Sequence, residues 1–93
     1  MAQLTTLESI YLQYTGLNGT IPEPFGPMPN LTVIDLGLNH LNGTIPSSLA
    51  LNTALVSLSL KSNQFSGTFP ASFSTLTNLT TLDLSSNKLS GDV

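Results

Sequence analysis

The sequence of 93 residues contains no cysteine, no tryptophan and only two cationic side chains, Lys61 and Lys88. The lack of cysteine excludes a disulfide scaffold, a cysteine nucleophile and a cysteine-ligated metal site. Two lysines cannot neutralise many phosphates, so nucleic acid is excluded as a partner. No apolar run approaches the roughly 18 residues of a membrane-spanning helix. No basic segment followed by an apolar one precedes the patterned sequence at Leu4, so no signal peptide is recognised.

The composition that remains is that of one folded domain. Hydrophobic residues make up 40% of the chain and charged residues 8%, which excludes a disordered, charge-rich tail. A chain of this length forms one domain, so residues 1–93 are expected to fold as a single unit.

An internal repeat of 24 residues runs through the whole chain without gaps, with frames at about 4–27, 28–51, 52–75 and 76–93. Leucine or isoleucine recurs at fixed positions, followed by asparagine, a further apolar residue and an invariant glycine. The clearest columns are Leu7, Leu31, Leu55 and Leu79; Ile10, Ile34, Leu58 and Leu82; Leu12, Leu36, Leu60 and Leu84; Thr15, Asn39, Asn63 and Asn87; and Gly19, Gly43, Gly67 and Gly91.

This pattern, L-x-x-L-x-L-x-x-N-x-L-x-G-x-I-P, resembles the plant-type leucine-rich repeat, and residues 36–46 carry it almost completely. The resemblance implies an α/β repeat solenoid, a right-handed superhelix of about four coils. Its parallel sheet would line the concave face, with extended and 3₁₀ segments on the convex face. A second, shorter strand is implied at the G-x-I-P stretch.

Elementary geometry accounts for the columns. Apolar residues two apart, such as Ile34 and Leu36, point to one face of a short strand, and the following asparagine can bond the backbone of a turn. Two departures are visible, because Thr15 interrupts the asparagine column and Asn52 occupies an otherwise apolar one. The proline-rich stretch 22–29 is expected to be a stiff connection without helix.

Neither end of the repeat carries a recognisable polar cap. A single coil cannot bury its own apolar face, so the first and last coils are expected to expose leucine, isoleucine and Val93. Two explanations fit: the repeats belong to a longer solenoid, or the ends associate with something else, including a second copy.

The outward strand positions between the ladder leucines are free of packing constraints and are the candidate partner contacts. Aromatic residues dominate interface energetics, and charged residues add direction. The candidates for a protein or peptide ligand on the concave face are Tyr11, Gln13, Tyr14, Asp35, Leu38, Lys61 and Asp83.

No catalytic, cofactor or metal site is predicted. Asp35 and Asp83 stand two coils apart, roughly 10 Å at the spacing of parallel strands, on an open surface without an apolar pocket, which does not suit a catalytic pair of carboxyl groups. His40 is the only histidine and is expected in an exposed turn after the strand, without a second metal ligand.

Two further patterns repeat. Four N-x-Thr sequons begin at Asn18, Asn30, Asn42 and Asn78, and each is an N-glycosylation candidate if the chain is secreted. The stacked threonines Thr20, Thr44 and Thr68 could form a regular polar array.

The resemblance implies a non-catalytic recognition module of the kind found in ectodomains of plant receptor-like kinases and receptor-like proteins. Any kinase domain would lie outside these residues. The alternatives are an inhibitor of a cell-wall enzyme, like the polygalacturonase-inhibiting proteins, and an ice-binding structural protein that uses the threonines. An extracellular or cell-surface location is implied, while the lack of a signal-peptide pattern leaves an intracellular one open.

Overall fold

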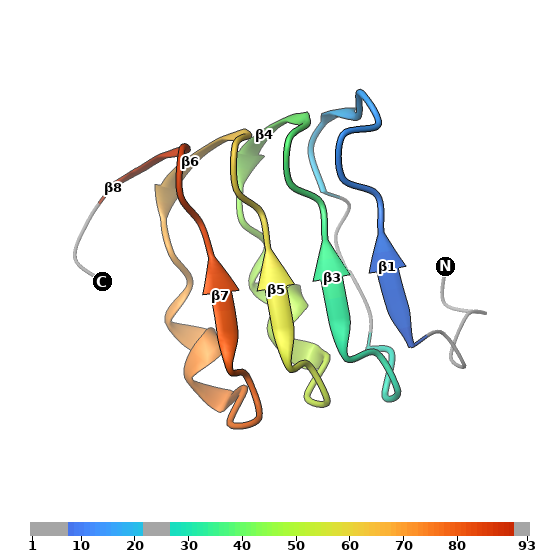
Figure 1. The fold of residues 1–93 in the computed structure, drawn as a ribbon. Helices are drawn as coiled ribbons and strands as arrows, with labels where there is room; N and C mark the ends of the chain where they lie inside the picture. Colours follow the sequence, from blue (N-terminus) through green and yellow to red (C-terminus); the bar gives the residue numbers. More distant parts are fainter. Residues whose placement is uncertain (1–7, 22–26, 91–93) are drawn as a thin grey trace.

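The computed structural model describes residues 8–21 and 27–90, which form a stack of four coils (Figure 1). Each coil contributes one strand to a parallel sheet, termed here the front sheet. Its strands, in spatial order, are β1 (Ser9–Tyr11), β3 (Val33–Asp35), β5 (Ser57–Ser59) and β7 (Thr81–Asp83). The predicted repeat solenoid with a parallel sheet is therefore confirmed.

The register of the front sheet follows the sequence repeat. Ile34 faces Ile10 on one side and Leu58 on the other, so that partners are 24 residues apart. Alternation along each strand turns these residues inward, where they form the apolar ladder predicted from the sequence. Ile34 and Leu58 are completely buried, and the sheet is one wall of the core.

A second parallel sheet, termed the rear sheet, forms the opposite edge of the coils (Figure 1). Its strands are β2 (Asn18–Gly19), β4 (His40–Thr44), β6 (Gln64–Thr68) and β8 (Lys88–Ser90). The prediction of a shorter second strand is wrong for the two central coils, where β4 and β6 have five residues against three in β3 and β5. These strands end before the Ile-Pro or Phe-Pro pair rather than running through it, because proline lacks the N–H that a ladder requires.

The rear sheet also has a different register. Asn42 pairs with Gln64 and Thr44 with Ser66, so that partners are 22 residues apart. Equivalent residues of successive coils are 24 apart, so each rear strand is shifted by two residues relative to its neighbour. The rear strands therefore run obliquely to the direction of stacking. Thr44 therefore pairs with Ser66 and does not face Thr68 across the sheet, so the threonines that could have formed a regular array are not aligned as strand partners.

Two 3₁₀ helices complete the second and third coils, η1 (Ser47–Leu51) and η2 (Ala71–Thr75). Each follows a proline with extended backbone, Pro46 or Pro70, which suits the fixed φ of proline at a helix start. The predicted 3₁₀ segments are thus confirmed. Of the proline-rich stretch predicted to be helix-free, residues 22–26 lie outside the described residues.

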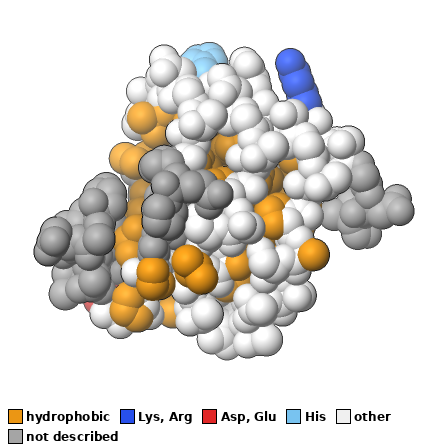
Figure 2. Space-filling view, turned by 180° about the vertical axis from the view of Figure 1, so that it is seen from behind, with side chains coloured by type: hydrophobic (Ala, Val, Ile, Leu, Met, Phe, Trp, Pro, Cys, Tyr) orange, Lys and Arg blue, Asp and Glu red, His pale blue; other side chains and the backbone are white. Residues whose placement is uncertain are grey.

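The core is a column of apolar side chains enclosed by the two sheets and the 3₁₀ helices. Its buried members are Ile21, Met28, Leu31, Ile34, Leu36, Leu41, Ile45, Leu49, Ala50, Leu55, Leu58, Leu60, Phe65, Phe73 and Leu76. The surface seen from behind carries few charged side chains (Figure 2). Among the described residues, no helix has the length and apolar character needed to cross a membrane.

The predicted asparagine ladder joins the coils at the turn after each front strand. The Asn63 amide donates to the carbonyl oxygens of Leu36 and Leu60, and its Oδ1 accepts the N–H of Leu41 at 3.0 Å. Asn39 and Asn87 repeat this arrangement. Thr15 has one hydroxyl donor, which reaches the Leu12 carbonyl at 2.7 Å.

Asn52, which interrupts an apolar column, is fully buried and acts as a second polar link. Its amide donates to the Leu49 carbonyl within η1, and its Oδ1 accepts the N–H of Met28 at 2.8 Å. The side chain thereby connects the second and third coils. A buried polar group is tolerated here because its donor and acceptor both have partners.

The end coils leave ladder leucines open, as the sequence predicts. Leu12 is 44% exposed and Leu82 43%, whereas Leu36 and Leu58, their equivalents in the interior coils, are buried. Val93, expected to be exposed as well, lies outside the described residues.

Candidate partner-binding face

The outward residues of the front sheet form one row across the four coils. Tyr11 faces Asp35, Asp35 faces Ser59, and Ser59 faces Asp83 in the strand register. Strand alternation turns these side chains away from the core that Ile34 and Leu58 fill. Tyr11 is 61% exposed, and the other three are partly exposed. This row takes no part in core packing and is available for contacts.

Four predicted contacts do not lie on strands. Gln13, Tyr14, Leu38 and Lys61 follow the last residue of their strands and belong to the turn that leaves the sheet. The expectation that they are strand positions is wrong, because only three residues of each coil pair as a front strand. They remain at the carboxyl edge of the sheet, beside the outward row.

Every coil adopts a left-handed backbone at the same position of this turn. The φ angles are 59° at Tyr14, 58° at Leu38, 56° at Ser62 and 58° at Ser86, although none of these residues is glycine. In the first three coils, the turn N–H donates to a carbonyl of the next coil, as Leu38 does to Lys61 at 2.9 Å. The hydrogen bonds between stacked coils therefore impose this conformation. The sequence gives no signal for it, because none of the four positions is glycine.

The left-handed turn presents large side chains in the first two coils only. Tyr14 is 84% exposed and Leu38 45%, while the third and fourth coils carry Ser62 and Ser86 at this position. Together with Tyr11, these side chains make an uncharged, aromatic and apolar patch at one end of the face. A left-handed residue other than glycine costs roughly 1–2 kcal/mol.

The two aspartates of the outward row each close their own turn. Asp35 Oδ1 accepts the N–H of Gly37 at 3.1 Å, and Asp83 Oδ1 accepts the N–H of Ser85 at 3.1 Å and the Ser85 hydroxyl at 2.7 Å. These hydrogen bonds, with a smaller contribution from the Lys61 charge, lower the pKa of the Asp83 carboxyl. A carboxyl held ionised on an open surface is unsuited to donate a proton near neutral pH.

The Lys61 side chain lies over the second coil. A Cβ placed on Gly37 would come within 3.1 Å of Lys61 Cγ and 3.3 Å of the Lys61 carbonyl oxygen. The absence of a side chain at Gly37 therefore lets the lysine stem lie close to the sheet. Its ammonium group is the one positive charge of this face within the described residues, and it belongs to the third coil, between the coils that contain Asp35 and Asp83.

No metal site is built by the described residues. They contain no group of three or more histidine, cysteine, aspartate or glutamate side chains that could hold an ion. His40 is exposed, as predicted, but it begins strand β4 instead of lying in a turn, and its N–H donates to the Leu17 carbonyl at 2.7 Å.

All four sequon asparagines are exposed, and none lies on the front sheet. Asn18 and Asn42 belong to rear strands β2 and β4. Asn30 and Asn78 lie in the turns that precede the front strands β3 and β7. Glycans at these positions would leave the outward row of the front sheet uncovered.

Stacked coils with leucine ladders, an asparagine ladder and paired parallel sheets define a leucine-rich repeat solenoid. The chain belongs to the leucine-rich repeat family, which matches residues 5–65 and 53–92. No curated protein matches the sequence.

Solved structures place the chain close to plant receptor ectodomains. It resembles the plant peptide hormone receptor RGFR1, solved in complex with RGF2, with a TM-score of 0.93 and 36% identity over 99% of this chain. The Arabidopsis receptor kinase HAESA, solved with the peptide hormone IDA and the co-receptor SERK1, shares 42% identity over 88% of this chain with a TM-score of 0.82. The BIR2 ectodomain from Arabidopsis shares 36% identity over 88%, with a TM-score of 0.83.

The chain is much shorter than these relatives. It spans 15% of the RGFR1 chain, 14% of the HAESA chain and 43% of the BIR2 ectodomain.

Proposed function

We propose that this chain is a non-catalytic recognition module, belongs to the extracellular part of a plant-type leucine-rich repeat receptor and binds a protein or peptide on the front sheet. The observation that carries the proposal is the outward row, whose side chains are free of core packing while Ile34 and Leu58 of the same strands are buried. The similarity to receptors solved with peptide hormones and a co-receptor supports this type of partner.

The contacts proposed for this partner combine an apolar patch with isolated charges. Tyr11, Tyr14 and Leu38 supply exposed apolar area, the type of surface that anchors interfaces. The polar contacts proposed beside them are Gln13, Asp35, Lys61 and Asp83. Because the Asp35 and Asp83 carboxylates already accept turn hydrogen bonds, their orientation is set before a ligand arrives.

An extracellular location also assigns a role to the sequons. Glycans on Asn18, Asn30, Asn42 and Asn78 would cover the rear sheet and the turns below the front strands, and so confine protein contacts to the outward row. The exposure of all four asparagines supports their modification in a secreted chain.

Neither alternative gains support. The 22-residue register of the rear sheet offsets the threonines that an ice-binding surface would align, and no observation favours an inhibitor of a cell-wall enzyme.

Selection of short random peptides displayed on phage against the immobilised chain tests the proposal. The change is a triple variant with Tyr11→Ser, Tyr14→Ser and Leu38→Ser, which removes exposed side chains only. We expect peptides that are enriched on the unchanged chain to lose binding to this variant at least tenfold. A control variant, Leu51→Ser, removes a 49% exposed leucine from η1 and should bind normally. Equal retention on the triple variant and the unchanged chain would refute the front sheet as the binding face.

A further inference from the structure

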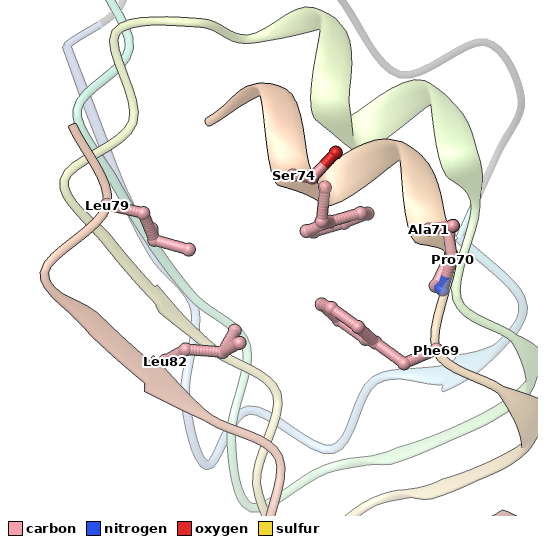
Figure 3. A pocket seen from close by; sticks show the side chains of 7 residues that line it. Phe69, Pro70, Ala71, Ser74, Leu79 and Leu82 are labelled. Atoms are coloured by element: carbon pink, nitrogen blue, oxygen red, sulfur yellow. The ribbon is translucent and has the colours of Figure 1, made fainter. Parts of the chain in front are cut away.

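The charges of the outward row distinguish it from the apolar hollow beside η2. That hollow is lined by apolar residues and one serine, and none of its described lining residues is charged. In Figure 3, Leu79 and Leu82 point across it toward Phe69. The outward row instead contains two carboxylates beside a tyrosine. Groups of this kind discriminate between ligands by charge.

The two aspartates of the outward row hold their carboxylates in the same way. In Asp35 and Asp83, Oδ1 accepts the N–H of the residue two positions later, at 3.1 Å in both cases. No hydrogen bond from the described part of the chain reaches Oδ2 of either carboxylate. Each aspartate therefore keeps an oriented acceptor for a ligand. Two intervals of the parallel-strand spacing place these acceptors roughly 10 Å apart.

Tyr11 adds an aromatic ring beside the first of these carboxylates. It is the strand partner of Asp35 in the front sheet, so the two outward side chains lie on neighbouring strands. A guanidinium or ammonium group can lie against an aromatic face while it donates to a carboxylate. The pair formed by Tyr11 and Asp35 therefore suits a basic side chain of the ligand.

Lys61 limits where a second basic side chain can bind. It belongs to the third coil, between the coils of Asp35 and Asp83, and its stem lies over Gly37. Like charges repel, so the ammonium group disfavours a basic ligand residue over the third coil. Two basic residues therefore have to bind on either side of this coil, one at each aspartate.

We propose that the ligand of the front sheet is an extended peptide with two basic residues three positions apart, which bind Asp35 and Asp83. In a polyproline-II backbone that runs along the row, side chains three apart point the same way and are separated by about 9.3 Å. This separation fits the two-coil distance, whereas residues two or four apart point in different directions. The proposal rests on the proposed function, because it names the chemical class of that ligand.

The backbone of such a peptide also suits the face. A polyproline-II segment forms no internal hydrogen bonds, so its carbonyl oxygens need donors from the partner or from water. The outward row and the turn beside it supply donors in Ser59 and Gln13.

Fluorescence anisotropy with three labelled peptides of identical composition tests the proposal. Each peptide carries two arginines in a background of alanine and proline, placed two, three or four positions apart. We expect the full 93-residue chain to bind the peptide with arginines three apart more tightly than either of the others. The difference should be about threefold or more, the size expected for exposed charge pairs, and it should shrink as salt is added.

Asparagine variants separate the charge of the aspartates from their place in the turn. Asp35→Asn and Asp83→Asn each keep an Oδ1 that can accept the turn N–H, but they remove the carboxylate. In both variants the preference for arginines three apart should disappear. The matched control is Glu8→Gln, which removes one negative charge from an exposed side chain just before β1 and should keep the preference. Circular dichroism checks that all three variants are folded.

Three results would overturn the proposal: no binding of any of the peptides, equal binding of all three, or loss of the preference in Glu8→Gln. The last result would mean that the peptides respond to the net charge of −3 and not to the two aspartates. The recognition function fails separately. If the front sheet selects phage peptides without basic residues, that function stands while the proposed ligand class is wrong.

Discussion

Replacing Asn63 by alanine should destabilise the chain more than its size suggests, because this side chain links two coils. The Asn63 amide donates to three carbonyls, and its Oδ1 accepts the N–H of Leu41 at 3.0 Å. The side chain is buried, with 7% of its surface exposed. Alanine removes all four hydrogen bonds at once.

The expected loss in the free energy of unfolding depends on which groups are left without any hydrogen-bond partner. The three carbonyls keep a second donor each: the Asn39 amide for Leu36, the Asn87 amide for Leu60 and the Leu38 N–H for Lys61. The Leu41 N–H accordingly loses its acceptor in a buried strand, which costs about 1–3 kcal/mol. Adding the weakened bonds to the carbonyls, we expect Asn63→Ala to lower the free energy of unfolding by about 3 kcal/mol.

Urea denaturation followed by circular dichroism measures this difference. The matched control is Thr15→Ala, in the same column of the first coil. There the Leu12 carbonyl keeps the Asn39 amide as a donor, so we expect a loss below about 1 kcal/mol. If Asn63→Ala costs no more than Thr15→Ala, the reasoning from the orphaned Leu41 N–H is refuted.

Three further predictions concern charge, backbone strain and modification. The hydrogen bonds from Ser85 lower the pKa of the Asp83 carboxyl in the folded chain below its ordinary value of 3.8, which an NMR titration should show. The ionised carboxylate therefore stabilises the fold above the unfolded pKa, and this stabilisation is lost as the pH falls through the folded pKa. Asp83→Asn should accordingly make the free energy of unfolding depend less on pH at the acid end. Leu38→Gly removes the steric strain of a left-handed residue other than glycine, so it should raise the free energy of unfolding in urea by about 1 kcal/mol. The same change removes an exposed apolar side chain and should weaken peptide binding. A loss of stability would contradict the strain assigned to this turn. Expression through a secretory pathway should attach a glycan to Asn42, and Asn42→Gln should remove one glycosidase-sensitive band shift on a gel.

Much of the fold was predictable because it depends on spacing alone. The columns that contain Ile34, Leu36 and Asn39 repeat every 24 residues. Two apolar residues that are two positions apart predict one face of a strand, and the asparagine after them predicts the turn that follows. The front sheet keeps this period as its register, so the ladder partners could be written down from the sequence. Exposure of Leu12 and Leu82 followed for the same reason, since end coils lack one neighbour.

The candidate site was predicted less completely. The sequence correctly marked Tyr11 and Asp35 as outward residues of one row, because they alternate with ladder residues. It placed Tyr14 and Leu38 on strands, whereas both occupy a left-handed turn. Left-handed backbone is normally signalled by glycine or asparagine, and neither residue type occupies this position in any coil.

By itself, the sequence determined the repeat, the inward face of each strand and the polar ladder, because these follow from the periodicity of side chains along one chain. Only the tertiary structure decided the 22-residue register of the rear sheet, the left-handed turn and the role of Asn52. The physical reason is common to all three. Each depends on hydrogen bonds and close contacts between neighbouring coils, and these depend on the angle and distance at which the coils stack, which no single repeat contains.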